Sequence, residues 1–148
     1  MSTYIDAQHA MIRRLQAMPG RPALAYPNAA NKAPLPRIVV QVSAQTAQAL
    51  TFDGIADATT EIVAQVEVAE SQGSTADAIV QAVCDQFPLH ARFDGLFIQQ
   101  PPQPRPGFQG DGYYSVPVVI RARHFFCTPT TGGGHARSLP QFGHCGRH

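Results

Sequence analysis

The sequence predicts an α+β domain, a mostly antiparallel β-sheet with two α-helices packed on one face. Three observations support this. Between Thr60 and Glu70 apolar and polar residues alternate, as in a strand with one buried face. From Ala76 to Phe87 apolar residues recur at helical spacing. A further alternating segment spans residues 112–126, and strands that come in pairs with helices set apart are typical of this fold class.

The N-terminal part predicts one helix and two strands before the alternating segment at Thr60. Residues 3–18 carry a rough apolar stripe at helical spacing, and residues 23–26 form a short strand. Residues 37–44 alternate and predict a longer strand. We expect this strand to pair antiparallel with the one that begins at Thr60, through a hairpin whose long, mobile tip covers residues 45–59.

The predicted second helix begins at Ser74, an N-cap residue type, with Asp77 in its first turn, and ends before Pro88. A strand over residues 93–99 follows, with an interruption at Gly95. Prolines then crowd residues 101–107, which predicts a stiff, projecting polyproline loop.

The last strand spans residues 112–126. Pro117 within it indicates an edge position or a bulge, because proline cannot donate to the sheet. The expected order is therefore helix, strand, strand, strand, helix, strand, strand.

The chain divides into one domain, residues 1–126, and a Gly- and His-rich tail, residues 127–148, which we expect to be flexible. The tail holds zinc-type ligands in a spacing that matches no compact zinc finger. A structural zinc site is one interpretation, and a tail that is unstructured or ordered only by a partner is the one we favour. The residues concerned are Cys127, His135, His144, Cys145 and His148.

Composition favours a protein that works through its surface. Only 14% of the 148 residues are charged, against about a quarter in typical proteins, which suggests that other subunits cover part of the surface. The net charge of +1 attracts neither nucleic acid nor an anionic membrane. No membrane span or signal peptide is expected, and the three cysteines predict a cytosolic product without disulfides.

No catalytic motif is recognisable. A phosphate loop, a dinucleotide fingerprint and a nucleophile elbow are all absent from the sequence. Glu61 and Glu67 lie on one strand face, but about 20 Å apart, which is too far for a glycosidase pair. We therefore expect neither enzymatic activity nor a cofactor.

Arg121 and Arg123 lie on one face of the last strand and, with Arg37, predict a basic stripe. One interpretation is an ordinary solvated sheet face. The other is a subunit interface, in which these arginines pair with Glu61 and Glu67 of a neighbouring copy and so favour a ring.

Several local patterns together resemble the tail terminator proteins of long-tailed, siphovirus-type bacteriophages. They comprise the segment Ala23–Asn28, the strand Ile62–Val68, the helix Ser74–Phe87 and the segment Gly110–Val118. The resemblance covers residues 1–126. It implies a non-enzymatic ring, typically a hexamer, that caps the tail tube and joins it to a head-completion or neck connector protein. DNA would pass through the lumen without sequence-specific binding.

The resemblance also implies a location at the head–tail junction of the virion, with the host cytoplasm as the site of assembly. We expect two segments to dock onto the tube or the connector. One is the hairpin tip with Leu50, Phe52 and Asp53, and the other is the proline loop with Arg105 and Phe108. There are two competing hypotheses. One is another head–tail connector protein, and the other is a small metal-binding domain that uses the tail.

Overall fold

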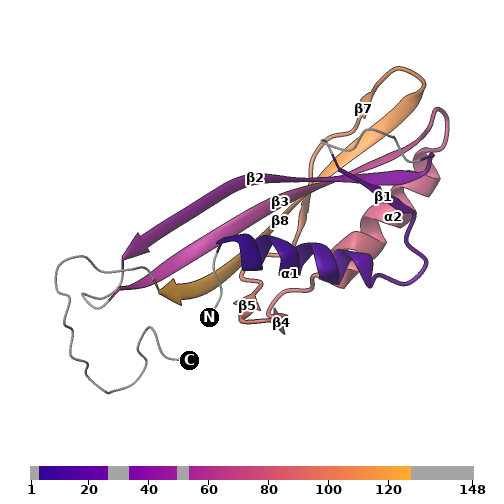
Figure 1. Cartoon of the computed structure of the whole chain (residues 1–148). Coiled ribbons are helices and arrows are strands. Elements are labelled where there is room, and N and C mark those ends of the chain that lie inside the picture. Colours follow the sequence, from indigo (N-terminus) through magenta and orange to yellow (C-terminus); the bar gives the residue numbers. More distant parts are fainter. Residues whose placement is uncertain (1–3, 27–33, 50–53, 128–148) are drawn as a thin grey trace.

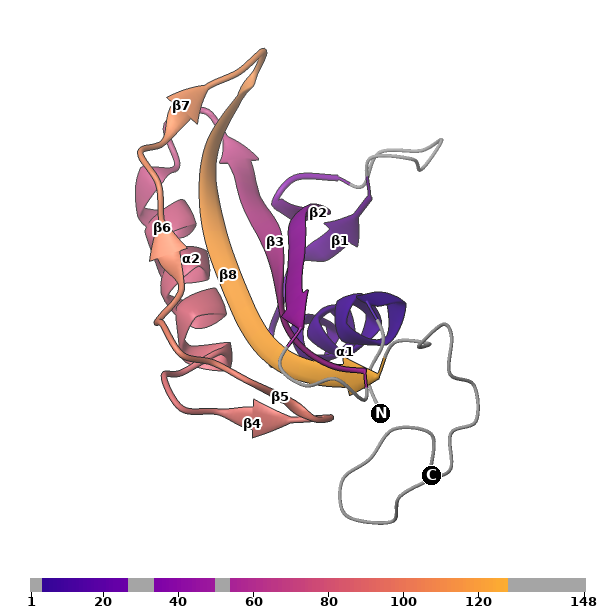
Figure 2. The ribbon, with the colours of Figure 1, turned by 90° about the vertical axis from the view of Figure 1, so that its left-hand side faces the viewer.

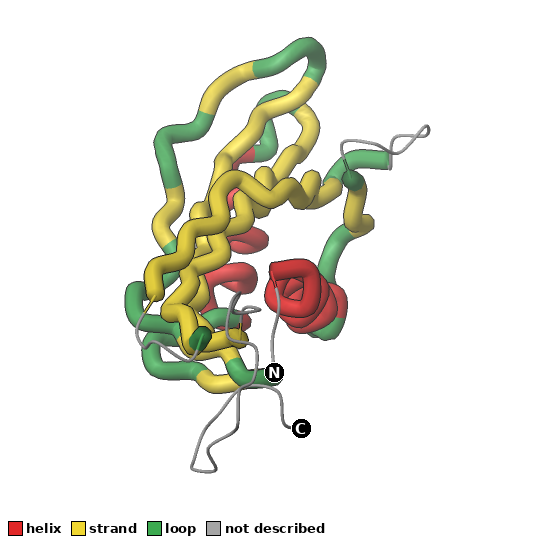
Figure 3. Tube along the Cα trace, turned by 60° about the vertical axis from the view of Figure 1, so that its left-hand side comes forward, coloured by secondary structure: helices red, strands yellow, loops and turns green. Residues whose placement is uncertain are grey.

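The computed structural model describes residues 4–26, 34–49 and 54–127. Two helices, α1 (Tyr4–Gln16) and α2 (Gly73–Gln86), pack on the same side of one sheet (Figures 1 and 3). This confirms the predicted α+β class with a mostly antiparallel sheet.

Three long strands dominate the eight-stranded sheet, whose order is β1-β2-β3-β8-β5-β4. The central strand β3 (Ile55–Ala69) pairs antiparallel with both β2 (Arg37–Ala49) and β8 (Tyr113–Cys127). At one edge β1 (Ala23–Ala25) runs parallel to the start of β2. Four two-residue strands pair on the other side: β4 (Arg92–Phe93), β5 (Leu96–Phe97), β6 (Gln103–Pro104) and β7 (Phe108–Gln109).

The core lies between the helices and the inner sheet face. Period-2 alternation along β3 buries the even-numbered residues, among them Ile62, Ala64 and Val66. Met11 and Leu15 of α1 and Val83 of α2 are equally buried and belong to the same cluster. The two helices are also joined directly, because Arg14 donates to the Gln86 carbonyl at 2.7 Å and the Gln86 amide donates back at 2.6 Å.

The β2–β3 hairpin is longer than predicted. Pairing continues to Ala49↔Ala56, so most of residues 45–59, predicted as a mobile tip, is strand, and that prediction was wrong. A bulge between Val42 and Ala44 shifts the register and exchanges the two faces of β2. The sequence period therefore breaks there, although the backbone hydrogen bonding continues. Residues 50–53 lie outside the described residues.

The predicted cap of the second helix was also wrong. The helix begins at Gly73, and its N-cap, Gln72, makes no side-chain capping bond. Ser71 adopts the left-handed conformation (φ 71°), so the chain turns into the helix before it reaches Ser74. The end of the helix before Pro88 agrees with the prediction.

Residues 93–99 do not form one strand. Asp94 and Gly95 both have positive φ and turn the chain between β4 and β5. The proline segment does not project either. It runs along β8 and pairs with it through β6 and β7 (Figure 2). Proline keeps the segment extended, and the non-proline residues supply the donors, as in the 2.8 Å bond from the Arg105 N–H to the Pro117 carbonyl.

That bond explains why proline is tolerated at position 117. In an antiparallel strand the N–H and C=O of one residue point to the same side. The Pro117 carbonyl faces the proline segment, so its missing N–H also faces that side. On that side β6 pairs with residues 118 and 119 of β8, and β7 pairs with residues 114 and 115. Pro117 lies in the gap between them, where no strand pairing requires its N–H.

Candidate assembly surface

The sheet face opposite the helices is the strongest candidate for a functional surface. We call it the outer sheet face, formed by the odd-numbered residues of β3 and their neighbours on β2 and β8 (Figure 3). No described helix covers it. It carries three Arg–carboxylate pairs, at the positions where charged residues of adjacent strands lie opposite or diagonal to one another.

The Arg37–Glu67 pair lies at one end of this face. The two residues are direct cross-strand partners, and Arg37 Nε donates to Glu67 Oε1 at 2.5 Å. Their side chains are only 13% and 5% exposed. Glu67 also accepts a hydrogen bond from the Gln65 amide at 2.8 Å, and the Arg37 guanidinium lies 5.5 Å from the centre of the Tyr113 ring. This pair is therefore largely removed from water.

The Arg121–Glu61 pair lies toward the other end and is more open. The residues are direct partners across β8 and β3, and Arg121 Nε donates to Glu61 Oε1 at 2.6 Å. Glu61 also accepts a hydrogen bond from the Ser43 hydroxyl, which the β2 bulge brings into reach. This hydrogen bond lowers the pKa of Glu61; burial opposes the shift, and the bond from Arg121 adds to it.

Arg123 binds Asp57 with both donors of its fork. Arg123 Nε lies 2.7 Å from Asp57 Oδ1, and a second nitrogen lies 2.5 Å from Oδ2. The guanidinium also stacks near Phe97 and Phe125, 5.7 and 5.5 Å from their ring centres. Phe125 is 40% exposed, so this end of the outer sheet face presents an aromatic surface beside a neutralised charge.

Between the charged ends the outer sheet face is uncharged and mixes apolar with amide side chains. Val63 on β3 lies between Gln41 on β2 and Val119 on β8, and the next row along contains Val39, Gln65 and Pro117. The three arginines and three carboxylates are thus already matched within one chain. What remains is an extended surface, suited to contact with another protein, on which these three pairs carry no net charge.

The predicted interface residues Arg121, Arg123, Glu61 and Glu67 do share this face. The structure pairs them within the chain, as described above, and it contains no second copy, so their role between subunits stays a prediction.

Of the predicted docking residues, Leu50, Phe52 and Asp53 lie outside the described residues. Arg105 is exposed on the proline segment, and Phe108, in β7, is 46% exposed.

The inner face holds a residue that the sequence analysis missed, His124. It is fully buried, and its Nε2 lies 3.1 Å from Thr60 Oγ1. Burial lowers the pKa of His124, and nearby Asp57 opposes the shift. The alternation of β8 places position 124 on the buried face, which is the signal that would have identified it.

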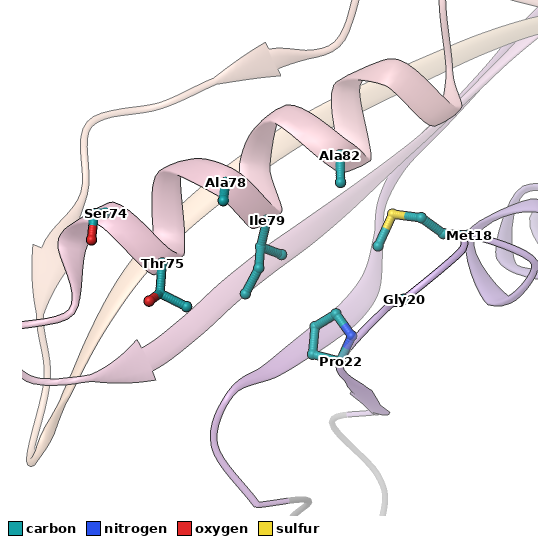
Figure 4. A pocket seen from close by; sticks show the side chains of 8 residues that line it. All are labelled: Met18, Gly20, Pro22, Ser74, Thr75, Ala78, Ile79 and Ala82. Carbon is teal, nitrogen blue, oxygen red and sulfur yellow. The ribbon is translucent and has the colours of Figure 1, made fainter.

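A hollow of about 400 Å³ lies on the helix side, between the α1–β1 connection and α2 (Figure 4). Met18, Gly20 and Pro22 line one wall, and α2 lines the other with Ser74, Thr75, Ala78, Ile79 and Ala82. None of these side chains titrates near neutral pH, so they supply no acid–base pair.

The described residues hold neither a group of metal ligands nor a membrane-spanning helix. Within residues 4–26, 34–49 and 54–127 no three His, Cys, Asp or Glu side chains come together in a group that could hold a metal ion. The predicted tail ligands lie outside this part, except for the backbone of Cys127. Cys84 is half-buried against the core, and burial raises the pKa of its thiol. Neither described helix is long and apolar enough to cross a membrane.

Comparison with known proteins gives a likeness in fold. No protein-family model and no curated protein matches the chain. One solved structure without a functional name has 17% identity and a TM-score of 0.57, over 87% of this chain and 100% of the other. A second comes from the virion of a native gene transfer agent particle, with 23% identity and a TM-score of 0.53, over 80% of this chain and 93% of the other.

Proposed function

We propose that this protein is a structural component of the virion of a long-tailed phage or phage-like particle. Its specific role is that of a tail terminator: copies form a ring, typically a hexamer, that caps the tail tube and joins it to the head-completion or neck connector. DNA passes through the lumen without sequence-specific binding. The protein acts by docking and catalyses no reaction.

One observation carries the proposal. The fold extends over 93% of a chain from the virion of a gene transfer agent, and over 80% of this chain, so nearly the whole domain corresponds. A shared fold by itself leaves function open. Here the shared fold agrees with two other features of residues 1–126, the order of elements and the local patterns that resemble tail terminators.

The outer sheet face supports a docking role. Ring subunits need broad, flat surfaces that meet without burying unmatched charge, because each unpaired buried charge costs several kcal/mol or more. The three ion pairs match six of the charged side chains of this face within one chain. In a ring around DNA, a neutral wall also avoids the electrostatic trapping that unpaired lysine or arginine would cause.

Apolar docking residues provide the test of the function. We expect Leu50→Ser, Phe52→Ser and Phe108→Ser together to leave the fold intact and to abolish the joining of heads to tails in particle assembly. Leu89→Ser is the matched control, since Leu89 is 44% exposed and Phe108 46%. Circular dichroism checks the fold, and electron microscopy counts joined particles. Normal joining by the folded triple variant would contradict the proposal.

A second candidate is another head–tail connector protein of the neck. The same fold match favours it, because the matching chain comes from a virion and its name gives no position within the particle. Position separates the two candidates: a terminator contacts the last ring of the tail tube directly. Cross-linking of the protein to the tube protein in intact particles would identify the terminator.

A further inference from the structure

Strand β2 is paired unequally on its two sides. On one side β3 accompanies it along its whole length, from Arg37 to Ala49. On the other side β1 pairs only with Arg37–Val39 (Figure 1). Beyond Val39, no other strand in the described parts of the chain pairs with this side of β2. Since alternate residues of a strand point their N–H and C=O to each side, this edge offers donors and acceptors to an incoming strand.

Apart from one bulge, the edge lacks the usual protection against pairing. Natural edge strands are blocked by charged side chains, proline or a very short length. The segment Ile38–Ala49 contains no charged residue, no proline and no glycine. The bulge between Val42 and Ala44 is the one protective device present in β2. Around it Val42 is 38% exposed, and Gln41, Ser43 and Thr46 are exposed as well.

The opposite side of the sheet offers no comparable edge. There the outermost strand is the two-residue β4, which includes the exposed Arg92, and β8 is accompanied by short strands. Among the described strands, β2 alone combines great length with a long open side. A copy of this chain that presents a long edge to β2 must therefore present its own β2.

We propose that the β2 edge, over Val40–Ser43 and Thr46–Gln48, is a strand-addition site whose occupant is the same edge of a second copy. The two strands pair antiparallel across a two-fold axis and join the two sheets into one. Self-pairing requires that an edge does not repel itself, and the absence of charge from Ile38 to Ala49 meets this requirement.

This inference does not depend on the proposed function. A ring is built from head-to-tail contacts between two different surfaces, whereas a two-fold contact uses one surface twice. A ring that leaves β2 free, and a β2 dimer that forms no ring, are both possible experimental results. The two proposals can therefore fail separately.

The test is sedimentation velocity of the purified full chain over about 1–100 µM, a range chosen around the affinities of weak specific complexes. We expect the wild-type mass to double, or an existing assembly to pair with itself, as concentration rises. The variant Val42→Lys with Thr46→Lys should shift the midpoint of this association at least tenfold to higher protein concentration, because lysine blocks edge pairing. Ala17→Lys with Ala78→Lys, at exposed sites near the end of α1 and on α2, adds equal charge and should behave as wild type.

Hydrogen exchange provides a second measurement on the unmodified chain. Within Val40–Ser43 and Thr46–Gln48, the amides that point away from β3 should exchange more slowly at high protein concentration than at low concentration. Protection that is independent of concentration would overturn the proposal, even if the lysine variant does not fold. A folded Val42→Lys, Thr46→Lys variant with the same mass distribution as wild type would also overturn it. So would a wild-type ring that this variant converts directly to monomers, because the edge would then be a contact within the ring.

Discussion

Charge on the outer sheet face is neutralised one pair at a time, and the pairs differ in their exposure to water. Arg37 and Glu67 have side chains 13% and 5% exposed, whereas the values for Arg121 and Glu61 are 38% and 19%. Removing one partner of a buried pair leaves an uncompensated charge, but removing one partner of an exposed pair costs little. The two pairs should therefore respond differently to the same substitution.

We expect Arg37→Ala to lower the free energy of unfolding by about 3 kcal/mol, because Glu67 is then left buried without its cation. Arg121→Ala should cost about 1 kcal/mol or less, since water reaches Glu61. Urea denaturation of both variants at pH 7 measures the difference. Equal losses would show that exposure does not decide the contribution of these pairs.

His124 predicts a dependence of stability on pH. Its pKa in the folded state lies below the ordinary value near 6.5 because of burial. The unfolded chain therefore binds the proton more readily, and stability is lost as the pH falls through 6.5 toward the folded-state pKa. The loss should not exceed about 1.4 kcal/mol per pH unit for this one group.

Denaturation of wild type between pH 7 and pH 5 checks this expectation. His124→Asn should flatten the slope over that range. An identical slope in wild type and His124→Asn would assign the pH dependence to other groups. Glu61, whose pKa is lowered, adds its own loss of stability at lower pH, below its ordinary value of 4.5.

At the scale of elements, the sequence predicted both helices and the long strands because each carries its own hydrophobic period. It did not predict where β2 ends, since the bulge at Ser43 interrupts the period while the pairing continues. For the same reason the sequence placed Arg121, Arg123 and Glu61 on strand faces but left Asp57, the partner of Arg123, in a loop. Pairing between distant segments is not encoded in local alternation.

The proline segment illustrates the same limit. Its composition correctly indicates an extended chain, but only the tertiary structure shows that β8 binds it. Close packing holds it there: a Cβ on Gly107 would lie 2.1 Å from the Tyr114 hydroxyl, whereas a Cβ on Gly73 would meet nothing within 4 Å. Glycine at position 107 thus permits a close approach that other residues would prevent.

We therefore expect Gly107→Ala to displace Tyr114 and weaken the pairing of β7 with β8, at a cost of about 1–3 kcal/mol, the usual range for overpacking. Hydrogen exchange at Phe108 and Gln109 should accelerate. Gly73→Ala, at the start of α2, is the control and should leave exchange at β7 unchanged. Unaltered exchange in Gly107→Ala would show that the Tyr114 ring moves aside without cost.

At the scale of the whole molecule, the α+β class and the helices on one face followed from the order of elements, and the structure confirms both. The same arrangement leaves the opposite sheet face and the β2 edge open within the described residues, and the proposed ring subunit would need such surfaces. The tail from residue 127 remains a prediction, as does its separation from the domain. Because the tail carries no hydrophobic period, its sequence pattern predicts neither a fold nor a function.

We propose that this chain works as one of several copies that dock at the head–tail junction. Single-particle electron microscopy of intact particles that contain the chain tests it most directly. We expect this fold to repeat around the tail axis as a closed ring between the last tube ring and the connector. A single copy, or copies located anywhere else in the particle, would contradict it.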